Sequence, residues 1–484
     1  MKSLRCRDLV FFLQMLFVVV LFHVMSDSDV RGGYRVTLAV PLERIAGFVG
    51  RAYLMETNAA LSPYALPGFR VALSVEDYVR GNGSFAYSCS LQVFLGDVKV
   101  WDSGHYSRFE VVNTCLLELT AGGDLQLRGP GDRVGWRTGT SGQGVERLQI
   151  LRTGNLVLVD EWDDIKWQSF NFPTDVMLHG QRLNVAARLT SFPGDFSSLH
   201  YSFEIQEDKI ALYLNSGKLK YSYWEFRPTK DRNITFVELG SKGLVLFNYY
   251  GRKIAQISPN PSVNLSIGTD PAVSPRFMSL NNRTGNLGLF YYSAGVSKFE
   301  AHFQALNKTC DLPTACKPYG ICTFADSCSC IRDHGCNNEA VTTDGFCDGE
   351  DAAEMVAIKG VTSVIKDGKK RDNLSKDECR EWCQGDCGCV ATLFVRGECH
   401  HYGIVMGVKQ VGGDDGEGDG NGSSYFVKVR KGTIGGGHGK SGLKRWALVL
   451  VGVVDGLIML VVVGGIGWYY LFKRRLGLLG TNDT

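Results

Sequence analysis

The residues with the clearest chemistry in this sequence are its cysteines. There are fifteen, and cysteines in such number serve either as disulfides in an oxidising compartment or as metal ligands. Cys6 lies in an N-terminal stretch that we expect to be removed, so an even set remains, which favours disulfides. That set is Cys89, Cys115, Cys310, Cys316, Cys322, Cys328, Cys330, Cys336, Cys347, Cys379, Cys383, Cys387, Cys389 and Cys399.

The cysteines are distributed unevenly along the chain. Cys89 and Cys115 stand alone in the first part, and we expect them to pair, whereas all the others lie between Cys310 and Cys399. A region with few disulfides must be held by its core, and a cysteine-dense region compensates for a small core. The distribution therefore predicts large domains followed by small stapled modules.

Asparagine sequons give a second signal. Seven Asn-X-Ser/Thr sequons occur in the same part of the chain, and each would place its asparagine on an accessible surface if it is glycosylated. They are Asn82, Asn233, Asn264, Asn282, Asn307, Asn373 and Asn421. Together with the cysteines they indicate a secreted ectodomain.

No catalytic or cofactor-binding constellation is recognisable. The nine histidines stand beside no nucleophile motif, and neither GxSxG nor HExxH occurs, so we do not expect an enzyme. We also expect no cofactor and no metal ion. The net charge of +2 gives no reason to expect a nucleic-acid partner.

Two metal-site interpretations are disfavoured. A zinc site is unfavourable because thiols in a secreted protein are consumed as disulfides. Its ligands would be Cys328, Cys330, His334 and Cys336. The acidic, glycine-rich run at 412–422 has Phe426 where a calcium loop needs a closing glutamate, so we interpret the run as a solvated loop.

Two apolar segments determine the expected topology. Lys2, Arg5 and Arg7 precede an apolar run at 9–24, which is typical of a signal peptide; we assign residues 1–26 to it, with a signal anchor as the alternative. Residues 446–472 are long enough to span a bilayer, because about 20 apolar residues cross a hydrocarbon core of about 30 Å. We expect a single-pass type I protein of the plasma membrane, with a stalk at 431–445 and a cytoplasmic tail at 473–484.

Asp455 is unusual within the expected span. A carboxylate at the centre of a membrane helix costs about 2.5–3.5 kcal/mol, and Gly452 and Gly456 form a small-xxx-small pattern that permits close helix approach. We expect either a lateral contact with a partner span through these three residues, or an aspartate that is protonated or reaches the interface.

Period-two apolar patterning between glycine-rich turns predicts a mainly β fold. One unit, an apolar strand with a glycine turn followed by Asn or Asp, recurs as AGGDLQL at 121–127, RTGNLVLV at 152–159 and RTGNLGLF at 283–290. Repetition on this scale favours a pseudo-symmetric β-prism or barrel over a Greek-key sandwich.

These residues carry a resemblance to a known family. RTGNLVLV, followed by WQSFNFPTD at 167–175 and HGQRL at 179–183, resembles the closing segment of a bulb-type mannose-binding lectin domain, as in plant S-domain receptor-like kinases and S-locus glycoproteins. The resemblance implies a lectin-like domain at 27–183, for which we expect Trp167, Phe170 and Phe172 to be buried anchors.

Residues 184–305 resemble the second β domain of the same family, less closely. This part contains an aromatic cluster that could line a carbohydrate platform, but we favour core or inter-domain packing. The cluster comprises Tyr221, Tyr223, Trp224 and Phe226.

The resemblance does not by itself predict sugar binding. The family binds mannose through a strand with Gln, Asp, Asn, Val and Tyr at alternate positions, whose polar groups bind the sugar hydroxyls. The matching strand here has Leu151, Thr153, Asn155, Val157 and Val159. The two other repeats offer Thr120, Gly122 and Asp124, and Asn282, Thr284, Gly288 and Phe290. Without paired donors and acceptors we expect the fold to be kept and the mannose site to be lost.

Two small modules complete the resemblance. The run CDLPTACKPYGICTFADSCSC at 310–330 resembles the family's EGF-like module, assigned to 306–340, whose six half-cystines allow fifteen pairings. KDECREWCQGDCGCVATLF at 376–394 resembles the plant PAN (apple-like) domain, assigned to 345–430. Cys379 and Cys383 lie at i and i+4 on one helical face, and our hypothesis pairs Cys379 with Cys399 and Cys383 with Cys389.

The resemblance covers nearly the whole expected ectodomain, but the family's kinase does not fit after residue 472. We therefore expect a kinase-less receptor-like membrane glycoprotein that binds an extracellular ligand or partner receptor through its lectin-fold and PAN modules. Its output would pass through a protein partner such as a receptor kinase. The alternatives are an adhesive protein that contacts cell-wall carbohydrate, and a decoy or negative regulator that dimerises.

Overall fold

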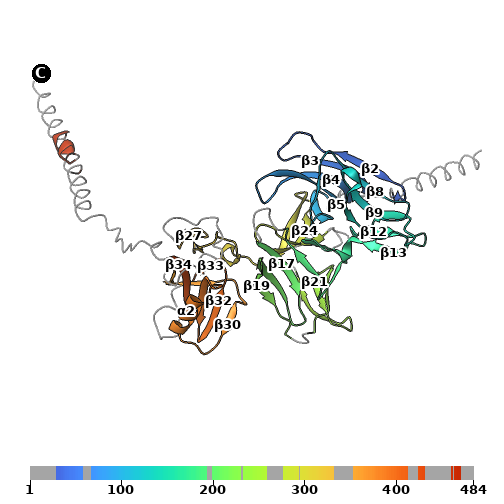
Figure 1. Ribbon diagram of the computed structural model, residues 1–484. Helices are drawn as coiled ribbons and strands as arrows, with labels where there is room; N and C mark the ends of the chain where they lie inside the picture. The colour runs from blue at the N-terminus through green and yellow to red at the C-terminus, as the bar shows by residue number, and fades with distance from the viewer. Residues whose placement is uncertain are drawn as a thin grey trace, which may run out of the picture. The chain divides into compact units, whose positions relative to one another are not determined.

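The computed structural model describes residues 29–57, 67–192, 199–229, 233–258, 276–293, 295–331, 353–411 and 423–430, together with Met459, Val461 and residues 463–469. Two compact units are distinguished, Met1–Lys428 and Val429–Thr484, and each is described by itself. The described part of the first unit is mainly β, as the period-two patterning predicts, and Figure 1 shows its strands from blue to orange.

The first β region has three antiparallel sheets. In sheet order, the first contains β1 (Val30–Arg31), β11 (Arg147–Ile150), β12 (Leu156–Val159) and β13 (Ile165–Gln168). The second contains β10 (Val134–Arg137), β9 (Leu125–Arg128), β8 (Thr114–Leu119) and β2 (Arg35–Ala39). The third contains β3 (Val49–Glu56), β4 (Phe69–Val79), β5 (Phe85–Leu95) and β6 (Val98–Asp102), and β7 (Phe109–Val111) also pairs with β5. Fully buried Leu73, Leu117 and Leu148 bring all three sheets into one core. Period-two burial makes this possible because alternate side chains of a strand point to the same face.

The second β region has three sheets as well, and each of these has four strands. They are β16 (Arg188–Thr190), β17 (Leu199–Ile205), β18 (Ile210–Ser216) and β19 (Leu219–Phe226); β15 (Arg182–Asn184), β20 (Phe236–Gly240), β21 (Gly243–Phe247) and β22 (Lys253–Ile257); and β14 (Val176–Leu178), β23 (Arg276–Leu280), β24 (Leu287–Ser293) and β25 (Lys298–Gln304). Short 3₁₀ helices occur at Pro130–Asp132, Ser169–Asn171 and Thr309–Asp311.

The boundary between the two β regions is interleaved. β14 precedes the expected boundary after residue 183, yet it pairs with β23 in the register Met177↔Met278. Val176, Leu178 and Phe277 belong to the same buried cluster as the core of the first region. The two regions therefore share apolar packing at this point.

The cysteine-rich region contains two sheets and one described α-helix. The sheets are β27 (Cys328–Cys330), β26 (Gly320–Cys322), β33 (Val408–Gln410) and β29 (Val361–Ser363); and β28 (Ala353–Ile358), β34 (Ser424–Arg430), β31 (Ala391–Val395), β32 (Glu398–Tyr402) and β30 (Lys369–Arg371). β26 is parallel to β33, with Ile321 opposite Val408. Strands from the two expected small modules thus belong to one sheet.

The helix α2 (Lys376–Gly385) begins with a complete capping box. The Glu378 amide donates to Ser375 Oγ at 3.3 Å, and the Ser375 amide donates to Glu378 Oε2 at 2.7 Å. A helix start leaves several backbone amides without partners inside the helix, and these two hydrogen bonds supply acceptors for two of them. The hydrogen bonds from Ser375 also hold the pKa of Glu378 below its ordinary value.

Most of the segments that define the expected membrane topology lie outside the described residues. The expected signal peptide lies outside them, and so do Gly452, Asp455 and Gly456. Within the expected span, Met459, Val461 and residues 463–469 are described and are helical. Among the described residues, no helix combines the length and the apolar character needed to cross a bilayer.

Replacing Ser375 with alanine is expected to lower the free energy of unfolding by about 1 kcal/mol, because the Glu378 amide loses its acceptor, the Ser375 hydroxyl. Chemical denaturation followed by circular dichroism measures the loss. Ser375 also completes the sequon of Asn373, so two controls are needed: Ser375→Thr keeps the cap and the sequon, and Asn373→Gln removes only the sequon. Equal losses in Ser375→Ala and Asn373→Gln would assign the effect to a glycan and contradict the capping role.

Candidate functional site

The three repeated glycine turns hold the polar positions from which a sugar site would be built. In the first turn, the Asp124 side chain hydrogen-bonds to the neighbouring segment 138–140. Its side chain is buried, and Oδ1 accepts hydrogen bonds from the Thr138 hydroxyl (2.9 Å), the Gly139 amide (2.7 Å) and the Thr140 amide (3.2 Å). Gln126 donates to Oδ2 at 2.8 Å. Burial opposes the charged form, but these hydrogen bonds outweigh it and lower the pKa of Asp124.

The asparagines of the other two turns are used in the same way. Asn155 donates from Nδ2 to Gln168 Oε1 at 2.8 Å, and its Oδ1 accepts from the Phe170 amide at 3.2 Å. Asn286 donates to the Leu306 carbonyl at 2.7 Å and accepts from the Leu306 amide at 3.1 Å. These side chains brace the turns against the next strand or loop, which leaves their polar atoms committed to internal hydrogen bonds.

The apolar positions of the matching strand are buried. Val157 and Val159 of β12 are 0% and 2% exposed. Neither offers a polar atom to a sugar, and the strand has no exposed face in the region of Leu156–Val159.

An aromatic cluster lies behind the closing segment. Trp101, Trp136 and Trp167 pack edge to face, with ring centroids 5.8 to 6.1 Å apart. Trp167 is 7% exposed and Phe170 packs on the core, but Phe172 is 51% exposed, so the expectation that it is a buried anchor is wrong. The reason is geometric: Trp167 fills the interior, and Phe172 stacks on its outer side at 5.6 Å.

The aromatic residues of β19 make packing contacts. Tyr221 and Tyr223 are each 4% exposed. The Tyr223 hydroxyl donates to the Gly285 carbonyl at 2.5 Å, and the Tyr221 hydroxyl accepts from the Gly403 amide at 2.7 Å. These buried hydroxyls are therefore not available to line a carbohydrate platform.

A polar cavity of about 230 Å³ lies where the two β regions meet. Lys99 lines it and contacts Asp102 Oδ2 at 2.8 Å and Glu76 Oε2 at 3.7 Å. Burial opposes the charged ammonium, but Asp102 and Glu76 outweigh burial and raise the pKa of Lys99. The cavity is also lined by Thr174, whose hydroxyl has no hydrogen-bond partner among the described residues.

Sequence reasoning missed this cavity. Its lining comes from β4, β5 and β6, from Thr174 and Asp175, and from the distant residues Phe192 and Asn282. The sequence marks some of these residues separately, as the Asn282 sequon and as Thr174 and Asp175 in the segment 167–175, but no motif connects them.

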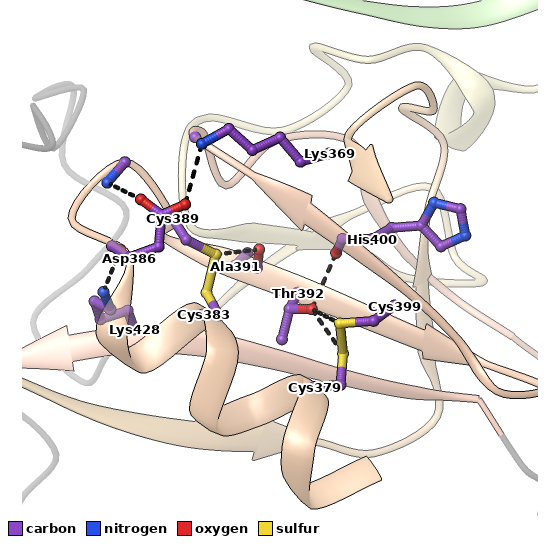
Figure 2. Close-up of a disulfide and its surroundings, with 12 residues drawn as sticks. Lys369, Cys379, Cys383, Asp386, Cys389, Ala391, Thr392, Cys399, His400 and Lys428 are labelled. Atoms are coloured by element: carbon purple, nitrogen blue, oxygen red, sulfur yellow. Dashed lines mark hydrogen bonds and ion pairs between the residues drawn. A yellow bond between two sulfur atoms is a disulfide. The ribbon is translucent and has the colours of Figure 1, made fainter. Parts of the chain in front are cut away.

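The described cysteines form disulfides. The structure pairs Cys89 with Cys115, Cys310 with Cys322, and Cys316 with Cys328. In the cysteine-rich region it joins both helix cysteines of α2 to the sheet, through Cys379–Cys399 and Cys383–Cys389, and Figure 2 shows these two bridges side by side. These two pairs coincide with the pairing hypothesis. Cys330 and Cys387 are also disulfide-bonded, whereas Cys336 and Cys347 lie outside the described residues.

Two groups of side chains have a spacing compatible with a metal ion. They are Cys383, Cys389 and His401, and Cys310, Cys322 and Asp326. In both groups the two cysteines are bonded to each other, so neither supplies a thiolate. The described members of the disfavoured zinc set, Cys328 and Cys330, are disulfide-bonded as well.

The sequons that the structure describes lie at the surface. The asparagines concerned are exposed, and they are Asn82, Asn233, Asn282, Asn307 and Asn373. Asn264 and Asn421 lie outside the described residues.

Replacing Asp124 with asparagine is expected to lower the free energy of unfolding at pH 7 by about 1–3 kcal/mol, because an acceptor-only carboxylate is replaced by an amide among buried donors. A lowered pKa means that the charged form contributes stability above the unfolded pKa, near 3.9, and that this contribution is lost as the pH falls. The difference between wild type and variant should therefore shrink below about pH 4. Urea unfolding followed by tryptophan fluorescence measures it.

Asp97→Asn is the matched control, since Asp97 is fully exposed and pairs only with Arg70 at 3.3 Å. It should change stability little at either pH. An Asp124→Asn loss no larger than that of Asp97→Asn would contradict the bracing role.

Comparisons with known proteins fit this geometry. The family model for D-mannose binding lectins matches residues 109–192. A PAN domain-containing protein of Arabidopsis thaliana is 28% identical over 375 residues, covering 72% of this chain and 71% of that protein. Two G-type lectin S-receptor-like serine/threonine-protein kinases of the same plant are 23% and 26% identical.

The extent of these similarities differs. The alignments with the two kinases cover 65% and 78% of this chain but 39% and 48% of the kinases, so the chain spans less than half of their length. Among solved structures, a monomeric mannose-binding lectin of Gastrodia elata is similar to 29% of this chain and 93% of its own, with 15% identity and a TM-score of 0.18. The resemblance to the plant S-domain receptor-like family is confirmed by the lectin family match and by the similarity to PAN domain-containing and S-receptor-like proteins.

Proposed function

We propose that this protein is a receptor-like membrane glycoprotein that binds an extracellular protein partner through its lectin-fold and PAN modules, without the family's mode of mannose binding. Its lectin-type and PAN-type segments are of kinds that bind rather than catalyse. The plasma-membrane location and the span at 446–472 are part of the proposal, and they rest on the apolar sequence of that segment.

The loss of mannose binding is supported by the three braced turns. A site that reads sugar hydroxyls needs side chains whose donors and acceptors are free to pair with the ligand. The polar side-chain atoms of Asp124, Asn155 and Asn286 instead form internal hydrogen bonds. The lectin fold of this chain therefore uses the polar groups of these turns for architecture.

The observation that carries partner binding is an exposed tyrosine pair between β21 and β22. Tyr249 and Tyr250 are each 82% exposed, and their rings lie 5.7 Å apart, edge to face. Hot spots of protein interfaces are enriched in tyrosine, because its side chain contributes a large contact area at small entropic cost.

The turn that carries the tyrosines is held by hydrogen bonds to the Asn248 side chain. Asn248 Oδ1 accepts from the Tyr250 amide at 3.1 Å and from the Arg252 amide at 2.9 Å. Gly251 has a φ of 69°, a left-handed conformation that glycine adopts without strain. The pair is thus presented on a pre-organised loop, which lowers the entropic cost of binding.

The protein is expected to pass through a mannose column without retention. A bulb-type lectin that keeps the family's polar strand serves as the positive control. Retention that free mannose reverses would contradict the proposal that the mannose mode is lost.

The double substitution Tyr249→Ser and Tyr250→Ser is expected to reduce recovery of membrane partners at least tenfold, since truncating a hot-spot residue costs about 2 kcal/mol or more and about 1.4 kcal/mol is already a factor of ten in affinity. Proximity labelling from an enzyme fused to the C-terminus, with quantitative mass spectrometry, measures recovery. Tyr53→Ser is the control, because Tyr53 is also an exposed tyrosine, at 52%, but lies on β3. Unchanged labelling of receptor kinases in the double variant would contradict the assigned surface.

A further inference from the structure

The polar cavity between the two β regions has a sequon at its edge. Asn282 lies in the turn between β23 and β24, is exposed, and lines the cavity. Its Oδ1 accepts a hydrogen bond from the Phe192 amide at 3.2 Å. This bond orients the side-chain amide at the cavity, and Nδ2 makes no hydrogen bond among the described residues.

The interior of the cavity contains a polar group that lacks a partner. Thr174 is 2% exposed, lines the cavity, and has a hydroxyl without a hydrogen-bond partner among the described residues. A buried hydroxyl left in this state destabilises the fold, because it has lost its hydrogen bonds to water and gained none. An occupant that hydrogen-bonds to Thr174 would remove that cost.

The other lining groups indicate the chemistry of the occupant. The lining mixes the carboxylates of Glu76, Asp102 and Asp175 with the ammonium of Lys99, which pairs with Asp102 at 2.8 Å. An ammonium has three N–H donors and a carboxylate about four acceptor sites, so this pair leaves hydrogen-bonding capacity on both groups. Trp101 and Phe192 form aromatic walls. Hydroxyl groups both donate and accept, so a polyol fits a mixed lining better than an ion of either sign. A metal ion is disfavoured, because the cation-compatible groupings among the described residues lie elsewhere.

The size of the cavity limits the occupant to a small one. Its volume of about 230 Å³ lies below the range of about 300–1,000 Å³ that holds drug-sized ligands. An occupant tethered at the rim also binds with a high effective concentration, so few contacts suffice to hold it.

We propose that Asn282 is N-glycosylated and that the first N-acetylglucosamine of its glycan occupies this cavity, where it links the two β regions. In the transfer, Nδ2 forms a bond to C1 of the sugar and loses one proton. The bond from C1 to the phosphate oxygen of a polyprenyl-pyrophosphate oligosaccharide donor breaks, and the polyprenyl pyrophosphate leaves with the bonding electron pair. Transfer to the unfolded chain precedes closure of the cavity, so the sugar is enclosed as the protein folds.

The test is the rate at which an amidase that cleaves the bond between asparagine and N-acetylglucosamine removes each glycan from the native full chain. The chain is expressed with oligomannose glycans, and site occupancy is followed by glycopeptide mass spectrometry. Cleavage at Asn282 is expected to be at least tenfold slower than at Asn82, which lies on an exposed hairpin turn away from the cavity. After denaturation both sites should be cleaved at similar rates.

Thr174→Val removes the hydroxyl without changing side-chain shape and is expected to raise the native cleavage rate at Asn282 at least threefold. Thr190→Val is the matched control, because Thr190 is also buried but does not line the cavity. An endoglycosidase that leaves one N-acetylglucosamine should leave the melting temperature unchanged. Thr284→Ala destroys the sequon and also removes the acceptor of the Asn286 amide, the Thr284 hydroxyl. It should therefore lower the melting temperature of the glycosylated chain by about 2–4 °C more than that of the chain expressed without glycans. Thr284→Ser keeps the sequon and should behave as wild type.

The outcomes separate this inference from the proposed function. An unmodified Asn282 beside modified sequons elsewhere, or cleavage at Asn282 as fast as at Asn82, would overturn the inference and leave the receptor-like role standing. Absence of glycans at every sequon would overturn both, because it would deny the secretory route.

Discussion

The apolar core shared by the sheets of the first β region is the constraint on which the rest of the structure depends. Leu73, Leu117 and Leu148 come from different sheets and are all fully buried, and burial of such a side chain contributes about 1.5–3 kcal/mol. Because side chains alternate along a strand, a slip of one residue in β8 would turn Leu117 to solvent. Burial of these side chains therefore sets the strand register, and the register sets which residues reach the turns.

In the repeated turns, polar side chains are buried and form internal hydrogen bonds. Asp124 and Asn155 are the polar residues of two of the repeated turns, yet both are less than 6% exposed and form internal hydrogen bonds. The three β turns are thus stabilised by the groups that a sugar site would need. The same fold can carry different functions because function resides in a few side chains, and here those side chains are committed to the fold.

The modules are joined more closely than their sequence boundaries suggest. β14 contributes to a sheet of the second β region, and β26 shares a sheet with β33 of the cysteine-rich region. The disulfides Cys379–Cys399 and Cys383–Cys389 attach α2 to its own sheet, where the small core of Cys379, Phe394 and Cys399 is the apolar cluster that they reinforce. A polar cavity and a shared apolar cluster then lie at the junction of the two β regions.

The sequence by itself determined the features that depend on near neighbours. Alternating apolar residues predicted the strands, and the i, i+4 spacing of Cys379 and Cys383 placed both sulfurs on one face of the helix. Only the tertiary structure decided which remote residues meet. β14 pairs with β23 about a hundred residues later, Phe172 is displaced outward by Trp167, and Thr174 and Asn282 line one cavity. Periodicity and capping act over a few residues, whereas these contacts arise when the chain closes over long loops, and no short pattern encodes that closure.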